Sequence, residues 1–237
     1  MTEVIWHDIE CGGYHLDLPL WRKLADTEGS PILDVGAGTG RVTLDLARRG
    51  HEVVALDREA DLLEALRDRA TGLAVTTVAA DARDFAIDRS FPLILVPMQT
   101  LQLMGGKDGR ARFLQRARAH LAPGGLIAVA LADALECFDE EHDQPPPPDM
   151  RDIGGVVYAS RPIRVRDLGG RAAIDRIREI VGADGSLTTL ENVVELDRIE
   201  PEVLEQEAAA LGLRADPQRR IPQTLEYVGS TVVMLRA

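Results

Sequence analysis

Short apolar runs alternate with stretches of helical hydrophobic spacing through residues 31–131. Runs of this length, bounded by Gly, Pro or Asp, are typical of buried parallel strands, and the stretches between them are typical of connecting helices. The pattern predicts strands at Pro31–Val35, Glu52–Asp57, Ala74–Ala79, Phe91–Pro97 and Gly125–Leu131. It predicts helices at Leu18–Asp26, Gly40–Arg49, Glu59–Arg69 and Asp108–Leu121, the last ending in a turn at Pro123–Gly125. Such alternation indicates βαβ units around a parallel sheet.

The pattern changes after Leu131. Residues Glu140–Asp149 are charged and contain four consecutive prolines, which favour an extended loop. Beyond them, apolar and polar residues alternate as in antiparallel strands, at Gly155–Asp167, Arg171–Val181 and Leu187–Ile199. Residues 182–186 predict a hairpin turn between the last two of these strands. A helix at Pro201–Leu211 and a strand at Tyr227–Arg236 complete the expected elements.

These elements predict an α/β fold: a doubly wound, mostly parallel seven-stranded sheet with helices on both faces, plus a small antiparallel β flap inserted after strand five. The expected parts are an N-terminal helical cap over the ligand site (residues 1–30), a Rossmann-like core (residues 31–135), the proline-rich loop and β flap (residues 136–200), and the last helix and closing strands (residues 201–237). A small sheet buries little apolar surface by itself. We therefore expect the flap to cover the ligand cleft or to join two subunits in a homodimer.

The amino-acid composition argues against several classes of binding partner. The chain has 27 Lys and Arg against 39 Asp and Glu, a net charge of −12, so its average field repels phosphate backbones and anionic lipids. No apolar run is long enough to cross a bilayer, and the first residues lack an export signal. Cys11 and Cys137 lie far apart and lack metal-ligand spacing. We expect a cytoplasmic protein with no nucleic-acid partner, no membrane partner and no metal site.

One segment carries the clearest chemical signal. Residues Ile32–Gly40 read ILDVGAGTG, a predicted strand that leads through a glycine turn into a helix. Glycines at 36, 38 and 40 let the backbone approach a bulky ligand, and the helix N-terminus offers unpaired N–H groups. Asp57 ends the next predicted strand, where a carboxylate can accept hydrogen bonds from both hydroxyls of a ribose. Together these residues predict a nucleotide site.

The ordered series resembles that of the class I methyltransferases: the acid and glycines of Asp34–Gly40, then Asp57, then Asp81–Ala82, then the Leu121–Gly125 turn. The resemblance covers about residues 30–131 and implies S-adenosylmethionine as the cofactor. It assigns the methionine part to the glycine turn, the ribose to Asp57 and the adenine amino group to Asp81. The cofactor-binding residues it predicts are Asp34, Gly36, Ala37, Gly38, Gly40, Asp57, Arg58, Asp81, Ala82, Pro97, Met98 and Gln99.

Other interpretations of the glycine turn stay open. A nicotinamide dinucleotide normally binds at G-x-G-x-x-G, whereas the spacing here is G-x-G-x-G. Asp34 precedes the first glycine and suits the cationic aminoacyl end and sulfonium of S-adenosylmethionine better than a pyrophosphate. Any one glycine can also be explained as a simple strand-to-helix turn. A protein that binds S-adenosylmethionine without turnover is a further alternative, because a fold does not establish catalysis.

The sequence has fewer motifs that indicate which acceptor binds or which residues act on it. Val96–Thr100 reads VPMQT and lacks the [D/N]-P-P-[Y/F] signature of enzymes that methylate nitrogens in nucleic acids and proteins, which favours a small-molecule acceptor. Methyl transfer is an in-line displacement that requires alignment and, in some cases, removal of a proton. Tyr14 and His15 are the catalytic candidates we single out, because they belong to a flexible segment that covers the cofactor in similar enzymes. The other candidate bases are His7, Asp133, Glu136 and His142, and each has a plain explanation as a surface or packing residue.

The function that these observations predict is S-adenosylmethionine-dependent transfer of a methyl group to N, O or C of a small-molecule acceptor. A non-catalytic S-adenosylmethionine-binding protein and a nucleotide-dependent oxidoreductase on the same fold are the alternatives.

Overall fold

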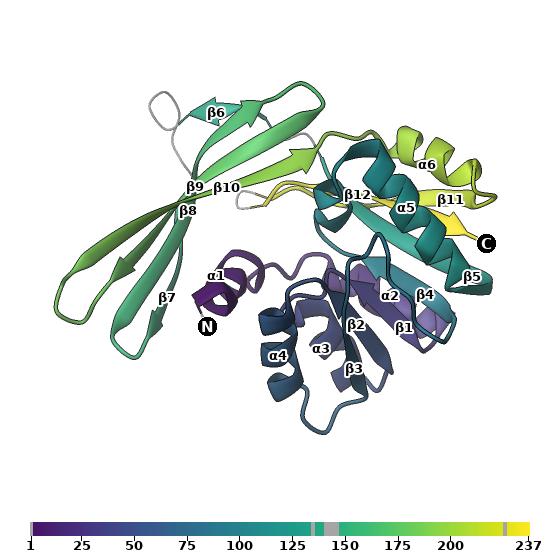
Figure 1. The fold of residues 1–237 in the computed structure, drawn as a ribbon, viewed down its shortest axis with the longest axis horizontal. Coiled ribbons are helices and arrows are strands. Elements are labelled where there is room, and N and C mark those ends of the chain that lie inside the picture. The colour runs from purple at the N-terminus through teal and green to yellow at the C-terminus, as the bar shows by residue number, and fades with distance from the viewer. Residues whose placement is uncertain (1, 134–135, 140–146, 225–226) are drawn as a thin grey trace. The chain divides into compact units, whose positions relative to one another are not determined.

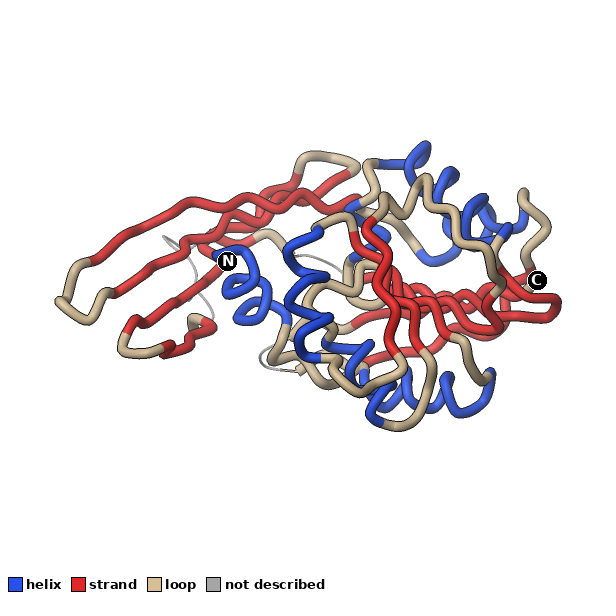
Figure 2. The backbone as a smooth tube through the Cα atoms, turned by 60° about the horizontal axis from the view of Figure 1, so that its bottom comes forward, coloured by secondary structure: helices blue, strands red, loops and turns tan. Residues whose placement is uncertain are grey.

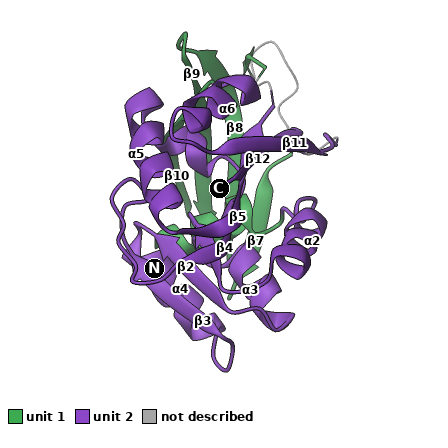
Figure 3. Cartoon of the chain, turned by 90° about the vertical axis from the view of Figure 1, so that its right-hand side faces the viewer, with its two compact units in different colours: residues 1–13, 134–198 green, residues 14–133, 199–237 purple. Residues whose placement is uncertain are grey.

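The computed structural model describes residues 2–133, 136–139, 147–224 and 227–237, which fall into two compact units (Figure 3). The core unit comprises Tyr14–Asp133 and Ile199–Ala237, and the flap unit comprises Met1–Gly13 and Ala134–Arg198. Within the described residues, no helix is long and apolar enough to cross a membrane.

The core unit is built around a seven-stranded sheet with helices on both faces (Figures 1 and 2). The strand order is β11–β12–β5–β4–β1–β2–β3, with β1 to β5 parallel to one another and β12 antiparallel to both β5 and β11. The elements are α2 (Leu18–Glu28), β1 (Ile32–Val35), α3 (Arg41–Arg48), β2 (Val53–Asp57), α4 (Ala60–Arg69), β3 (Val75–Ala79), β4 (Phe91–Val96), the 3₁₀ turn η1 (Thr100–Leu103), α5 (Gly106–Ala119), β5 (Leu121–Ala132), α6 (Pro201–Ala209), β11 (Arg214–Ile221) and β12 (Ser230–Arg236).

The direction in which strands are added changes between β1 and β4. From β1 the chain adds β2 and β3 on one side, and then crosses to add β4 and β5 on the other. In open α/β sheets, ligands bind at such a switch point, beside the carboxyl ends of the strands. The segments that follow β1, β2, β3 and β4 therefore define the expected site.

The predicted fold class is confirmed, as are the five parallel strands and their connecting helices. The strands were recognisable because parallel strands are buried on both faces: all four residues of β1 are buried. One boundary was wrong. β5 begins at Leu121, and the residues expected to form a separate turn lie within it.

The register explains this error. Phe91 pairs with Leu121 and Leu93 pairs with Leu126, so the four residues between Leu121 and Leu126 form a bulge. Pro123 has no N–H to donate to the sheet, and Gly124 has φ of 72°, a conformation that favours glycine.

The flap unit contains an antiparallel sheet of five strands in the order β10–β9–β8–β6, with β7 also paired to β8. Its elements are α1 (Thr2–Cys11), β6 (Phe138–Asp139), β7 (Asp149–Ile153), β8 (Val156–Asp167), β9 (Arg171–Val181) and β10 (Leu187–Asp197). The three long strands match the prediction. The pattern had not predicted α1 or β7, and much of the proline-rich loop, residues 140–146, lies outside the described residues.

Candidate functional site

The glycine turn follows β1 and has a conformation that requires glycine. Gly36, Gly38 and Gly40 have φ of 72°, 54° and 96°, in the left-handed region. A Cβ atom at Gly36 would lie 2.5 Å from Cγ2 of Thr100, and one at Gly40 would overlap Cδ1 of Leu66. Two of the three glycines are therefore needed for packing as well as for backbone conformation.

Asp57 joins the end of β2 to this turn. Its Oδ2 accepts a hydrogen bond from the N–H of Gly38 at 2.8 Å, and its Oδ1 accepts one from the N–H of Glu59 at 3.0 Å. A carboxylate has about four acceptor positions, so these bonds orient Asp57 without exhausting it. The predicted neighbours differ in exposure: Ala37 is buried in the turn, whereas Arg58 is exposed and pairs with Glu59.

Asp34 is a buried carboxylate beneath the turn. It is 1% exposed, and its Oδ2 accepts a hydrogen bond from Oγ1 of Thr43 at 2.6 Å. Its Oδ1 has no hydrogen-bond partner among the described residues. Burial raises the pKa of Asp34 to about 6, although Thr43 and the charge of Arg41 oppose the shift. Such a group is stabilised in its ionised form by a nearby cation.

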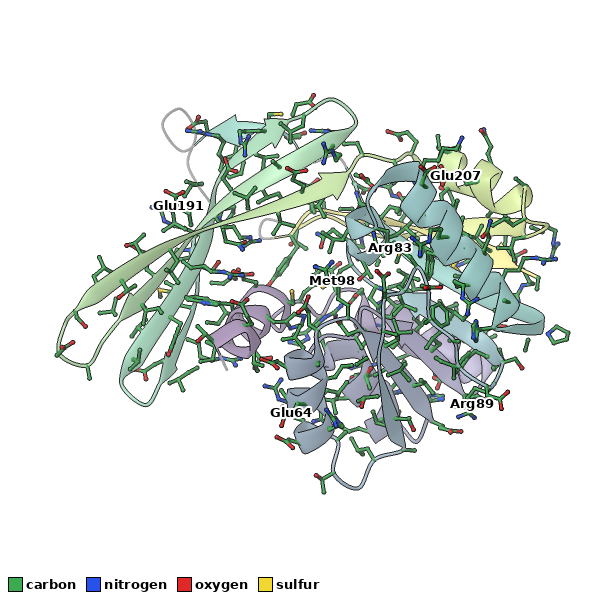
Figure 4. The ribbon with its side chains drawn as sticks, viewed as in Figure 1. Glu64, Arg83, Arg89, Met98, Glu191 and Glu207 are labelled. Carbon is green, nitrogen blue, oxygen red and sulfur yellow. The ribbon has the colours of Figure 1, made fainter. Side chains whose placement is uncertain are left out.

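Asp81 follows β3 and forms a bidentate pair with Arg83. Oδ1 of Asp81 accepts hydrogen bonds from the N–H and Nε of Arg83, and Oδ2 accepts one from Nη2 at 2.6 Å. The hydrogen bonds from Arg83 lower the pKa of Asp81 to about 2, so the carboxylate is an ionised acceptor at neutral pH. Figure 4 labels Arg83 in this segment, and the neighbouring Ala82 packs on the core.

The segment after β4 contains a backbone outlier. Met98, labelled in Figure 4, has φ of 54° although it is not a glycine. It follows Pro97, which is buried, and it precedes Gln99, the residue before η1. Oγ1 of Thr100 donates to the carbonyl of Pro97 at 2.9 Å, while the side chain of Thr100 lies against Gly36. Strained residues of this kind concentrate at functional sites, which supports a role for the 97–99 segment in lining the site.

Thr100 and Arg41 are contributors that the sequence analysis missed. Arg41, the first residue of α3, donates from Nη1 and Nη2 to both oxygens of Asp17 and from Nη1 to the carbonyl of Tyr14. The Arg41 and Asp17 side chains are only 8% and 1% exposed. This buried ion pair ties the segment before α2 to the helix that follows the glycine turn. The contacts are tertiary, and no spacing in the sequence indicates them.

The candidate bases are placed as follows. Tyr14 is buried, with its ring centroid 5.1 Å from that of Tyr227 and 5.2 Å from the Arg41 guanidinium, and burial raises its pKa. A raised pKa makes the phenolate scarcer at neutral pH, so Tyr14 is a poor proton acceptor. Asp133 accepts hydrogen bonds from Arg220 at 2.8 Å and Thr231 at 3.0 Å. The remaining candidates are His15, which is exposed in the core unit, His7 and Glu136, which belong to the flap unit, and His142, which lies outside the described residues.

Comparisons with known proteins agree with this geometry. Residues 32–125 match a family model described as a methyltransferase domain. The solved structure of the sugar N-methyltransferase KedS8 from Streptoalloteichus covers 100% of this chain and 93% of its own, with a TM-score of 0.80 and 16% identity. That of CalS10, an amino pentose methyltransferase from Micromonospora echinaspora with S-adenosylmethionine bound, covers 100% and 97%, with a TM-score of 0.73 and 20% identity.

Residues 32–125 thus match a methyltransferase domain, and the chain has the fold of S-adenosylmethionine-dependent methyltransferases of known structure. Among the relatives of this chain, the cypemycin N-terminal methyltransferase of a Streptomyces species is 29% identical over 161 residues, 68% of this chain and 63% of that protein. A probable cobalt-precorrin-6B methyltransferase of Methanothermobacter thermautotrophicus is 32% identical over 117 residues. The matched segments span 63% and 57% of these two relatives' own lengths.

The residues of the site fit S-adenosylmethionine, the cofactor bound in the CalS10 structure. Oδ1 of Asp34 is buried without a partner among the described residues and suits a cationic group of the cofactor. Asp57 lies beside the glycine turn and can accept further hydrogen bonds. Within the described part of the chain, no group of three or more His, Cys, Asp or Glu side chains is placed to hold a metal ion.

Proposed function

We propose that this methyltransferase transfers the methyl group of S-adenosylmethionine to the amine nitrogen of a small, hydroxylated molecule such as an amino sugar. The observation that carries the proposal is the match to KedS8 and CalS10 over 100% of this chain, flap unit included.

Sequence similarity supports the same class of acceptor. A dTDP-3-amino-3,6-dideoxy-α-D-glucopyranose N,N-dimethyltransferase of Streptomyces fradiae is 27% identical over 113 residues.

Methyl transfer of this kind requires few dedicated catalytic residues. When bound, S-adenosylmethionine would supply an activated methyl group. An ammonium acceptor would first lose one proton to solvent; its nitrogen would then form the new bond to the methyl carbon as the carbon–sulfur bond breaks and S-adenosylhomocysteine leaves. The chain must hold the acceptor in line and exclude water, which can account for most of the acceleration. In this proposal Asp57 and the glycine turn orient the cofactor, Asp34 balances its positive charge, and Pro97–Gln99 line the side that faces the acceptor. Tyr14 packs beneath the site rather than acting as the base.

The test offers matched acceptors to the full-length protein with S-adenosylmethionine. dTDP-3-amino-3,6-dideoxyglucose should gain one or two methyl groups by mass spectrometry, and dTDP-6-deoxyglucose, which has a hydroxyl in place of the amine, should gain none. Asp57→Ala, in which the cofactor should bind more weakly, serves as the control. Methylation of the hydroxyl compound alone would overturn N-methylation. Tight binding of S-adenosylhomocysteine without turnover of any amine would favour a non-catalytic binding protein.

A further inference from the structure

Met98 is the one non-glycine residue with a left-handed backbone in the part of the chain that the structure describes. It has φ of 54° and lies two residues beyond the end of β4. A side chain is disfavoured in this region because its Cβ crowds the carbonyl oxygen that follows, so such a residue persists only where its surroundings hold it. The contacts around Met98 therefore identify what holds this conformation.

The side chain of Met98 is anchored, whereas its backbone is not. The side chain is half-buried and packs on an apolar cluster of the core unit that includes Tyr14 and Trp21. The backbone N–H and C=O of Met98 have no hydrogen-bond partner among the described residues. Backbone polar groups that are shielded from water are nearly always paired. An unpaired N–H and C=O on a strained, half-buried residue are therefore available to a bound molecule.

Thr100, the first residue of η1, holds the backbone turn around Met98. Its Oγ1 donates a hydrogen bond to the carbonyl of Pro97 at 2.9 Å, so this bond spans Met98. The backbone N–H of Thr100 reaches the same oxygen only at 3.4 Å. The hydroxyl therefore provides the shorter of the two bonds that close the turn.

The same side chain touches the glycine turn. A Cβ atom at Gly36 would lie 2.5 Å from Cγ2 and 2.6 Å from Oγ1 of Thr100, so no side chain fits between them. The sheet explains this contact, because β1 and β4 are parallel neighbours and the segments that follow them begin side by side. Thr100 therefore lies against the turn after β1 while it holds the turn after β4.

These two contacts of Thr100 set the spacing between the glycine turn and Met98. In-line transfer depends on such spacing, since a shift of about 1 Å in the reacting groups can slow a reaction roughly a hundredfold. We propose that Thr100 is a positioning residue for methyl transfer: it fixes the distance from the glycine turn, which holds the cofactor, to Met98, whose unpaired backbone groups contact the reacting amine. This inference rests on the proposed function for the identity of the reacting group.

The first test measures binding without turnover. S-adenosylhomocysteine and sinefungin, which carries an amino group where the cofactor carries its methyl group, are titrated calorimetrically into the full-length protein. Thr100→Val replaces the hydroxyl with a methyl group, which cannot donate to Pro97. It should weaken sinefungin about tenfold, the loss expected for one hydrogen bond, and leave affinity for S-adenosylhomocysteine unchanged. Thr100→Ser keeps the hydroxyl and should retain the binding of both ligands.

Thr71→Val is the matched control. Oγ1 of Thr71 donates to the carbonyl of Asp68, three residues earlier, just as Thr100 donates to Pro97. Thr71 lies between α4 and β3, at the amino ends of the parallel strands and away from the glycine turn. The variant should therefore leave both affinities unchanged.

Turnover gives a readout that a purely structural role would not produce. With dTDP-3-amino-3,6-dideoxyglucose as acceptor, Thr100→Val should lower kcat by about ten- to a hundredfold and leave the KM of the acceptor nearly unchanged, because alignment acts on the transition state. Thr100→Ser should keep most of the wild-type kcat. Wild-type kcat in a folded Thr100→Val protein would overturn the inference while the proposed function stands.

Thermal melting tests the link to Met98 directly. Glycine adopts positive φ without being held, so Thr100→Val should lower the melting temperature less in a Met98→Gly protein than in the wild type. Equal decreases in the two backgrounds would show that Thr100 does not hold Met98, and would contradict the proposal.

The binding results separate the remaining outcomes. If Thr100→Val weakens S-adenosylhomocysteine as much as sinefungin, Thr100 supports the cofactor site in general and the positioning role is wrong. If the wild-type protein methylates no amine, the proposed function fails. A selective loss of sinefungin binding in Thr100→Val would then still place Thr100 beside the position of the transferred methyl group, and its absence would remove that role.

Discussion

The core unit and the flap unit are both built on β-sheets, but they bury their strands differently. Every residue of β1 is buried, whereas β10 exposes Leu187 and Val193 to 60% and 53%. A strand buried on both faces can offer polar groups to a ligand only where it ends, so the chemistry of the core unit is concentrated in the segments that follow β1 to β4. A strand with an accessible face exposes side chains along its whole length, as β10 does with Leu187 and Val193.

The prediction with the largest expected effect compares a buried ion pair of the core unit with a more exposed ion pair of the flap unit. Arg110 of α5 donates to both oxygens of Glu207 of α6, labelled in Figure 4, at 2.8 and 3.0 Å, and the side chains are 8% and 11% exposed. Glu207→Ala should lower the free energy of unfolding by about 3–5 kcal/mol in urea titrations, because it leaves a buried guanidinium unpaired. Asp175→Ala, which breaks the more exposed pair with Arg166 in the flap unit, should have a much smaller effect.

A compensating variant serves as the control. Replacing both partners with apolar residues of similar size, as in Arg110→Met with Glu207→Leu, should recover most of the lost stability. Equal losses for Glu207→Ala and Asp175→Ala would remove this contrast between the two units.

The second prediction compares the effects of replacing Gly36 of the core unit and Gly170 of the flap unit. Gly36→Val should cost about 2–5 kcal/mol of stability, because it combines a β-branched side chain at positive φ with overlap against Thr100. It should also abolish binding of S-adenosylhomocysteine. Gly170→Ala, in the hairpin between β8 and β9, should alter neither property, since a Cβ there meets no atom within 4 Å. Calorimetric titration and thermal melting check both variants, and normal cofactor binding by Gly36→Val would refute the assigned site.

Sequence reasoning succeeded where a local pattern decides the structure. The parallel strands β1, β2, β4 and β5 are largely apolar runs, and the glycine turn and Asp57 are contiguous with strand ends. It missed α1, where only Trp6 and Ile9 are buried, and it did not delimit β11, a polar edge strand interrupted by an irregularity between Asp216 and Arg219. The apolar periodicity of both segments is too weak to specify an element.

The missed site residues have a different cause. Arg41 and Asp17 are 24 residues apart, and Thr100 meets Gly36 only because β1 and β4 are neighbours in the sheet. Each is a tertiary relation between residues that look ordinary in the sequence, whereas strand-end motifs place their functional groups side by side.

The third prediction concerns the ribose assignment. Asp57→Ala should weaken binding of S-adenosylhomocysteine by about 1–3 kcal/mol, because two ribose hydroxyls lose a charged acceptor and the N–H of Gly38 loses its partner. Asp57→Glu is the conservative control and should recover part of the affinity. Calorimetry that shows wild-type affinity in a folded Asp57→Ala protein would contradict the assignment, and would leave the glycine turn as a purely structural feature.

The smallest expected effect is a pH dependence centred on Asp34. Burial raises its folded-state pKa to about 6 from an ordinary value of 3.8, so between these values the folded protein binds more protons than the unfolded chain. This group's contribution to stability therefore falls as pH rises from about 4 to 6, and it is constant above that window.

A bound cation favours the ionised carboxylate, so affinity for S-adenosylhomocysteine, through its ammonium group, should rise through pH 6 and then level off. Affinity at pH 5 should be roughly tenfold weaker than at pH 7, about 1.4 kcal/mol. Asp34→Asn should flatten this profile, because an amide does not titrate and the charge of Arg41 remains in both proteins. A profile that persists unchanged in a folded Asp34→Asn protein would place the titrating group elsewhere, and would separate the buried carboxylate from cofactor recognition.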